Sequence, residues 1–306
     1  MQEKSQTDFD LTGIGAELFN VYNEFCQLIN NHSNQYIEDS ITFKEFQSYP
    51  CSNSVATSYN QASVLFEAGL DQLLAFIKTI KEPTQTIAPF TCARAIIESS
   101  ALASWLFDPK IDVAERVARG FAFQYQGLDQ QKKFVQSLDD EKKEERTNLA
   151  IAQIENTEAI ALSQGFQVLR DRDKRTGIGK IMPGSTEIIR DTMDKESTYR
   201  LLSAIIHGHQ WTLHHLSFRT VNLEDLEFDK NETFVGPVFE KYFSVEAKSF
   251  LCQEVFICLA RPIWYKYELF GWNRDQLKGI LDKTSNVIKA EEELRFWKLD
   301  GERSNT

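Results

Sequence analysis

Glycine and proline are scarce in this chain of 306 residues: 14 glycines and 7 prolines make up about 7% of it, where about 12% is usual. Because these two residues mark most turns, their scarcity predicts few turns and long elements. Hydrophobic residues make up 42% of the chain and aromatic residues 12%, enough to bury a sizeable core. The composition therefore predicts a globular, mainly helical protein and excludes a disordered one.

Cysteine is also sparse, and none of the five cysteines belongs to a CxxC pair. An odd number of cysteines in mostly apolar stretches is typical of reduced thiols, and it disfavours a structural zinc site or a disulfide framework. A basic start followed by an apolar run is missing too, and the most apolar window, Ile87 to Phe107, is interrupted by Arg94 and Glu98. These features predict a cytoplasmic protein without a secretory signal or membrane partner.

A positive net charge is missing as well, since the formal net charge is −11. Basic surface supplies most non-specific nucleic-acid binding, so this charge excludes a protein that coats RNA or DNA and leaves only a local basic patch. One such patch lies in the stretch 170–184, which contains glycines and lacks helical periodicity. It is either a solvated loop or an RNA-binding arm, and the candidate contacts are Arg172, Lys174, Arg175 and Lys180.

Apolar residues recur at helical spacing along most of the chain, and short breaks separate the segments. Asp112 follows one break and is well placed to cap the next helix. Short connections place consecutive helices antiparallel. The sequence predicts an all-α bundle of about seven to nine helices, in one domain spanning 1–306 with a soft boundary only at 170–185. The long helices are expected near 11–31, 55–80, 87–107, 113–138, 141–166, 245–271 and 274–297.

Two features interrupt this helical pattern. The stretch 218–243 has strand-like or irregular character and predicts one short insertion, such as a small hairpin. Pro262 lies inside the helix expected at 245–271, where its missing backbone donor should kink or break the helix. The aromatic residues around Pro262 are either a base-stacking surface or, as their helical spacing favours, part of the core.

Four of the five histidines gather in one segment, Tyr199 to Leu216. Drawn as one continuous helix, the segment has an apolar face that includes His209, which predicts that His209 is buried and satisfied by a backbone group. His215 falls at the border of that face. The opposite, polar face carries Tyr199, Arg200, Ser203, His207, Gln210, Trp211 and His214.

A metal site in this segment is not expected. His207 and His214 are two turns apart, about 10.5 Å along a helix axis, which is too far to share one ion. The HExxH and ExxH spacings are absent, and His32 is the only histidine elsewhere. Arg200 and His207 offer different chemistry, because a phosphate lying between them could be held by the guanidinium while the imidazole moves a proton. Ser203 lies between them on the same face.

The spacing Arg200-x6-His207 resembles the R-x4-6-H signature of the HEPN superfamily of helical bundles, many of which are metal-independent ribonucleases of toxin–antitoxin and antiviral systems. The wider pattern of Tyr199, Ser203, His207 and Gly208, preceded by Arg94, Glu98 and Trp105, also looks like a group of uncharacterised bacterial helical proteins. The chain departs from the superfamily pattern at Leu201, where many active members carry a polar residue.

The resemblance implies a symmetric homodimer in which two histidine-bearing helices form one RNA cleft. Arg200 would hold the scissile phosphate, His207 would act as acid or base, and the 2′-hydroxyl of the RNA would attack, with no metal or other cofactor. An antitoxin or another defence protein would be the partner. The competing hypothesis is a non-catalytic interaction or sensor protein in which a network of Tyr199, Ser203 and His207 fixes helix packing.

Arg94 and Glu98 are four residues apart on an otherwise apolar helix, so both charges are expected to turn inward as a pair. The pair either organises the bundle or supports the site, with Glu98 orienting His207 or Arg94 contacting a second phosphate. Arg116 and Arg119 could join either arrangement or be solvated. Hydrolase triads, P-loops and dinucleotide fingerprints find no match in the sequence.

Overall fold

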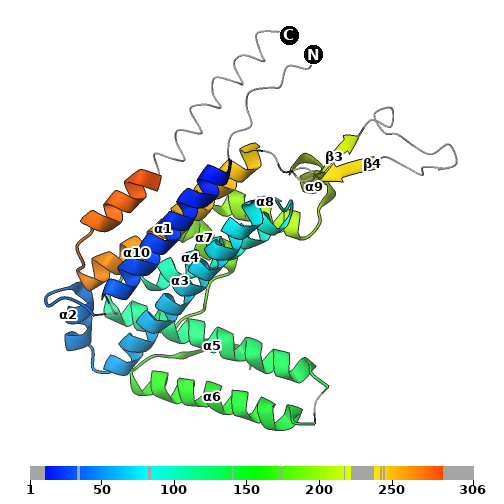
Figure 1. Ribbon diagram of the computed structural model, residues 1–306. Coiled ribbons are helices and arrows are strands. Elements are labelled where there is room, and N and C mark those ends of the chain that lie inside the picture. The colour runs from blue at the N-terminus through cyan, green and yellow to red at the C-terminus, as the bar shows by residue number, and fades with distance from the viewer. Residues whose placement is uncertain are drawn as a thin grey trace, which may run out of the picture.

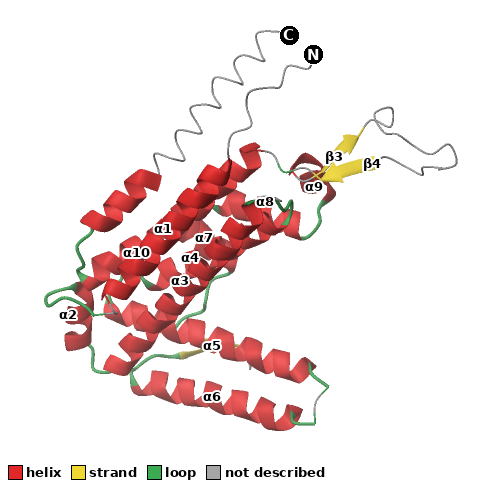
Figure 2. Ribbon diagram, viewed as in Figure 1, coloured by secondary structure: helices red, strands yellow, loops and turns green. Residues whose placement is uncertain are grey.

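The computed structural model describes residues 11–32, 35–81, 84–139, 141–172, 174–216, 218–221, 238–241, 243 and 245–284. Within these ranges the chain is a helical bundle with two small hairpins (Figure 1, Figure 2), which confirms the predicted all-α class. The bounded helices are α1 Leu11–His32, α2 Ile41–Ser48, α3 Ser52–Ile80, α4 Ala88–Leu106, α5 Val113–Ser137, α6 Lys143–Ser163, α7 Ser185–Met193, α8 Glu196–Ile206, α9 Gln210–Leu216 and α10 Val245–Phe270. Residues 275–284 are also helical.

Helices α3, α4 and α10 form the centre of the bundle. Small residues on α4, such as the fully buried Ala93 and Ser100, allow neighbouring helices to approach closely. Gly69 of α3 serves the same contact, since a Cβ there would lie 3.0 Å from the Ser99 hydroxyl and 3.2 Å from a Leu259 methyl group. One hydrophobic cluster joins these helices to residues on both sides of the stretch 170–185.

Helices α5 and α6 form an antiparallel pair that projects from the bundle (Figure 1). Asp112 begins α5 as predicted, because its carboxylate accepts a hydrogen bond from the backbone N–H of Glu115 at 2.8 Å. The buried stripe of α6, which packs on α5, consists of Ala150, Ile154, Thr157 and Ala161. The surface that α6 buries is therefore a narrow stripe of small and branched side chains.

The stretch 170–184 was expected to be a non-helical loop or arm, and it is non-helical, but its first part belongs to a β-hairpin. β1, Val168–Asp171, pairs antiparallel with β2, Lys174–Ile178. Arg172 takes a positive φ of 53° beside the turn. Position 177 has no room for a side chain, because a Cβ there would lie 2.4 Å from the carbonyl oxygen of Lys180. The hairpin expected within 218–243 is present, because β3, Phe218–Val221, pairs with β4, Val238–Lys241.

Helix α10 continues from Val245 to Phe270 through Pro262, so of the predicted kink or break the break does not occur. A proline inside a helix costs about 3 kcal/mol. Burial compensates this cost, because Leu259, Ile263 and Tyr267 on the surrounding turns are almost completely buried. The aromatic segment is therefore largely core, as its spacing favoured. The helix expected at 274–297 is observed over 275–284, and its remainder lies outside the described residues.

A buried ion pair joins α2 to α5. Arg116 has no exposed side-chain surface, and its guanidinium donates to both carboxylate oxygens of Glu45 at 3.0–3.2 Å. The Tyr59 hydroxyl donates to the same carboxylate at 2.6 Å, and the backbone carbonyls of Leu106 and Asp108 accept from Arg116. The expectation that Arg116 is solvated or joins Arg94 was wrong, because its partner Glu45 lies 71 residues away on a short helix that the sequence did not predict.

Burial of Lys266 should make the stability of the protein depend on pH. Burial lowers the pKa of Lys266 from 10.5 to about 8, and Glu67 opposes this shift. A depressed folded-state pKa gives stability that is present above pH 10.5 and is lost as the pH falls through 8. We expect the free energy of unfolding to rise by up to about 3 kcal/mol relative to Lys266→Met between these limits. Chemical denaturation at pH 7.5 and 10.5 measures this, and equal pH dependence of both proteins would contradict it.

Candidate functional site

The histidine-rich segment is two helices rather than one. α8 ends at Ile206, with His207 as its C-cap, and Gly208 follows with a φ of 71°. The N–H of Gly208 donates to the carbonyl of Ile205, and the N–H of His209 donates to that of Ala204. This pair of bonds is a Schellman motif, for which glycine is the preferred residue. The continuous helix was therefore a wrong prediction, and Gly208 was the signal that it overlooked.

The break changes where the side chains lie. His209 is exposed, so its predicted burial was wrong, because the chain leaves the helical path two residues earlier. Tyr199 was placed on the open polar face, yet it is only 8% exposed. Trp211 of α9 is 59% exposed. The side chains of His32, His214 and His215 lie outside the described residues.

Gly208 and Gly127 form a matched pair for testing the break. A Cβ at either position would meet no atom within 4 Å, but only Gly208 has a positive φ. Gly208→Ala should lower the free energy of unfolding by roughly 1–2 kcal/mol, the cost of left-handed backbone for an L residue. Gly127→Ala, within α5, should raise it by about 0.5–1 kcal/mol. Urea denaturation of both variants measures this, and a stabilised Gly208→Ala would show that α8 and α9 can fuse.

Arg94, Glu98 and Tyr199 form a cluster between α4 and α8. The Tyr199 hydroxyl donates to Glu98 Oε1 at 2.7 Å and accepts from Arg94 Nη2 at 3.3 Å. Arg94 Nε also donates to Glu98 Oε1 at 3.0 Å, and its guanidinium lies 5.3 Å from the Tyr199 ring centroid. The expected inward-facing pair is thus present, and it is only partly exposed. Its partner from α8 is Tyr199.

The electrostatics of this cluster keep the tyrosine protonated. Burial, and then the hydrogen bond to Glu98, raise the pKa of Tyr199 above its ordinary value. A protonated hydroxyl can donate to a carboxylate and accept from a guanidinium at the same time. The cluster therefore presents a fixed guanidinium and a fixed hydroxyl at the junction of α4 and α8.

Arg200 and His207 lie on the exposed side of α8. The Arg200 side chain is 69% exposed, and its guanidinium is paired with Glu196 at 2.8 Å. His207 is exposed at the end of the same helix, and Ser203, between them, is partly buried. Sequence reasoning missed Glu196, although a Glu four residues before an Arg is a recognised helix pair. The described partners of Glu98 are Arg94 and Tyr199, so Glu98 does not orient His207 as suggested.

The basic residues of the β1–β2 hairpin divide into two groups. Arg172 and Lys174 are exposed next to the turn. Arg175 is paired with Glu158 of α6, and Lys180 is paired with Glu115 of α5. These pairs fasten the hairpin to the α5–α6 arm. Only Arg172 and Lys174 of the four predicted RNA contacts are therefore presented without an ion pair in the described part of the chain.

Among the described residues, no group of three or more histidine, cysteine, aspartate or glutamate side chains is arranged to hold a metal ion. In the same ranges, no helix combines the length and apolar character needed to span a membrane. No protein-family model, curated protein or solved structure matches the chain.

Proposed function

We propose that the surface around α8 binds RNA and cleaves it without a metal ion. The observation that carries this proposal is that Arg200 and His207 are both open to solvent on one helix, beside the Arg94–Glu98–Tyr199 cluster. Arginine is suited to a phosphodiester because its planar guanidinium matches two phosphate oxygens. Histidine is the side chain most often used for proton transfer near neutral pH.

The chemistry requires only these residues and the RNA. Arg200 leaves Glu196 to hold the phosphate, and the 2′-hydroxyl attacks phosphorus while the bond to the 5′-oxygen breaks. His207 moves a proton in this step, and the products are a 2′,3′-cyclic phosphate and a free 5′-hydroxyl. Arg94 lies one helix away as a second cation. The exposed Arg172 and Lys174 are proposed as outlying phosphate contacts. Arg175 and Lys180 instead hold the hairpin against α5 and α6 through their ion pairs.

The resemblance to HEPN ribonucleases extends the proposal to the oligomeric state and the biological system of this protein. We infer a homodimer in which two α8 helices flank one RNA cleft, acting in a toxin–antitoxin or antiphage system with a protein partner. The acidic net charge of −11 argues against extensive coating of a nucleic acid, so the proposed RNA contact is confined to a local surface. Leu201 is partly buried. The cleft therefore lacks the additional polar group that many active members have at this position.

Incubation of purified protein with total RNA in EDTA tests the proposal. Wild type should cleave the RNA, and Arg200→Ala should be folded and much slower. Arg190→Ala is the matched control, because Arg190 is an exposed arginine on α7 that is paired with a neighbouring carboxylate, as Arg200 is. RNA left intact by wild type, or equal loss of activity in both variants, would refute the assignment of Arg200.

A second candidate function is a non-catalytic interaction or sensor protein. The observation in its favour is that Tyr199 is 8% exposed and joins α8 to α4 through two hydrogen bonds. Tyr199 was expected to form a network with Ser203 and His207, but the partners of its hydroxyl are Arg94 and Glu98. Under this proposal Tyr199→Phe lowers the melting temperature and wild type leaves RNA intact, whereas RNA cleavage by wild type favours the nuclease.

A further inference from the structure

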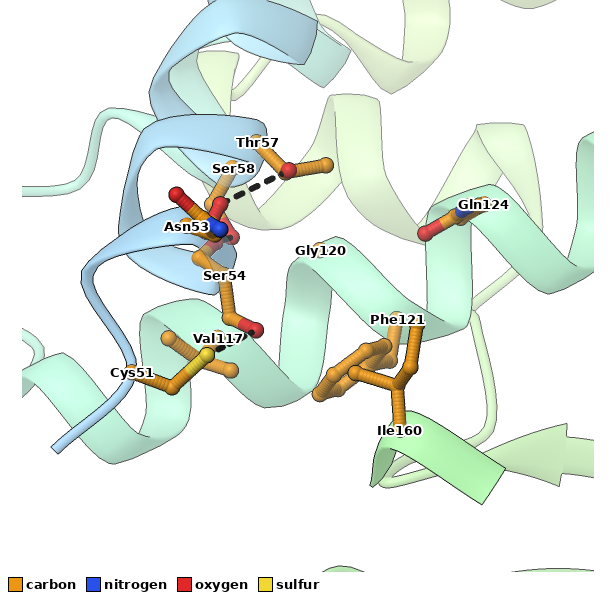
Figure 3. Close-up of a pocket in the computed structure, with 10 residues that line it drawn as sticks. All are labelled: Cys51, Asn53, Ser54, Thr57, Ser58, Val117, Gly120, Phe121, Gln124 and Ile160. Atoms are coloured by element: carbon orange, nitrogen blue, oxygen red, sulfur yellow. Dashed lines mark hydrogen bonds between the residues drawn. The ribbon is translucent and has the colours of Figure 1, made fainter. Parts of the chain in front are cut away.

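A cavity of about 310 Å³ lies where the start of α3 meets the first half of α5 and the end of α6 (Figure 3). Its volume is at the lower end of the range for small-molecule sites. None of its lining residues is charged: Cys51, Asn53, Ser54, Thr57, Ser58, Val117, Gly120, Phe121, Gln124 and Ile160. Hydroxyl, amide and thiol groups thus share the wall with apolar side chains, a surface that suits an uncharged molecule.

Gly120 keeps part of this space open. A Cβ at this position would lie 2.2 Å from the Ser58 hydroxyl oxygen, so any larger residue would displace Ser58, which is 1% exposed. The same Cβ would lie 3.4 Å from Oε1 of Gln61, one turn further along α3. Among the described residues, that buried oxygen accepts no hydrogen bond. This acceptor belongs to the packing around Gly120 and is not part of the cavity lining.

Cys51 brings a nucleophile to the cavity. It is the N-cap of α3, and its sulfur accepts a hydrogen bond from the Ser54 hydroxyl at 3.5 Å (Figure 3). That hydroxyl is held in place by Gln164, whose amide donates to it at 2.8 Å. The hydrogen bonds from Ser54 and from the backbone N–H of Asn53 lower the pKa of the Cys51 thiol. The half-buried thiols of Cys26 and Cys92 differ, because burial raises their pKa.

We propose that this cavity binds small uncharged molecules with an electrophilic carbon and that Cys51 captures them covalently. The thiol proton passes to solvent, and the sulfur then forms a bond to the electrophilic carbon. The bond from that carbon to its leaving group breaks, and the leaving group takes the electron pair. The site lies apart from α8, so the proposal stands independently of RNA cleavage.

Two alkylating probes of different charge test the proposal. Iodoacetamide is uncharged and iodoacetate is anionic, and both lose iodide to a thiolate. Peptide mass spectrometry follows each cysteine in the full-length native protein and in the urea-unfolded chain, at about 0.15 M salt to screen the net charge. We expect iodoacetamide to label Cys51 on the order of tenfold faster than Cys26 or Cys92. The preference for iodoacetamide at Cys51 should be larger in the native than in the unfolded protein.

Ser54→Ala removes the hydroxyl that supports the thiolate and should slow labelling of Cys51 several-fold, whereas Ser52→Ala, an exposed serine in the same turn, should not. Circular dichroism confirms that both variants are folded. Labelling of Cys51 no faster than of Cys92 would overturn the proposal. Fast labelling of Cys51 would also overturn the proposal if the native and the unfolded protein showed the same preference for iodoacetamide over iodoacetate. The thiol would then react without any contribution from the cavity.

Discussion

Replacing Arg116 with methionine should lower the free energy of unfolding by about 3–5 kcal/mol, the usual cost of leaving one partner of a buried ion pair without its counter-charge. Methionine retains most of the buried volume, so the loss reports charge and hydrogen bonding more than packing. The Glu45 carboxylate, 8% exposed, would keep only the Tyr59 hydroxyl of its two described side-chain partners. Urea denaturation at neutral pH is the measurement.

Arg119 is the matched control for this substitution. It lies one turn further along α5 and also donates to the Trp105 carbonyl, but its ion-pair partners Glu115 and Asp108 are 31% and 27% exposed, so Arg119→Met should cost less, about 1–2 kcal/mol. The double variant Glu45→Gln, Arg116→Met should be more stable than Arg116→Met alone, because no unpaired charge is then buried. A loss below 1 kcal/mol for Arg116→Met would contradict the role given to this pair in joining α2 to α5.

Under the proposed nuclease mechanism, replacing His207 with alanine should lower the rate of RNA cleavage by about 10²–10⁴-fold, the usual contribution of a general acid or base. The side chain is exposed at the end of α8, so the variant should retain the wild-type melting temperature. His209→Ala is the matched control, because His209 is also exposed and lies two residues away in the same turn. Gel analysis of a labelled RNA under single-turnover conditions gives the rates.

Two results would contradict this assignment. If both histidine variants cleave as wild type does, His207 has no part in the chemistry. If the melting temperature of His207→Ala falls together with its activity, the role of His207 is to stabilise the C-terminal end of α8. Retention of cleavage by His209→Ala with loss in His207→Ala separates the two positions, although they share one turn.

Helix class and position were predictable because apolar periodicity extends over many residues in α3, α4 and α5. Shorter elements were not, since α2 has only eight residues and lies among polar neighbours. Its buried Glu45 became recognisable only with Arg116 opposite, 71 residues away along the chain. The β1–β2 hairpin was missed because its strands have four and five residues with many charges. Pro262 does not break α10, because tertiary packing can outweigh a single lost hydrogen bond.

The candidate site was partly predictable. The i,i+4 spacing correctly paired Arg94 with Glu98, yet nothing local indicated that Tyr199 would join them from another helix. The helical wheel assumed one continuous helix through Gly208, and this assumption misplaced His209. A glycine directly after a run of helical residues is a termination signal. Applied to this segment, it would have ended α8 where the structure ends it.

The most direct test of the nuclease proposal is the chemistry of the RNA ends produced by wild-type protein in EDTA. Attack by the 2′-hydroxyl predicts a 2′,3′-cyclic phosphate on one fragment and a free 5′-hydroxyl on the other. These ends should form with wild type and His209→Ala and not with His207→Ala. RNA that remains intact with wild type, or fragments carrying a 5′-phosphate, would contradict the mechanism assigned to Arg200 and His207.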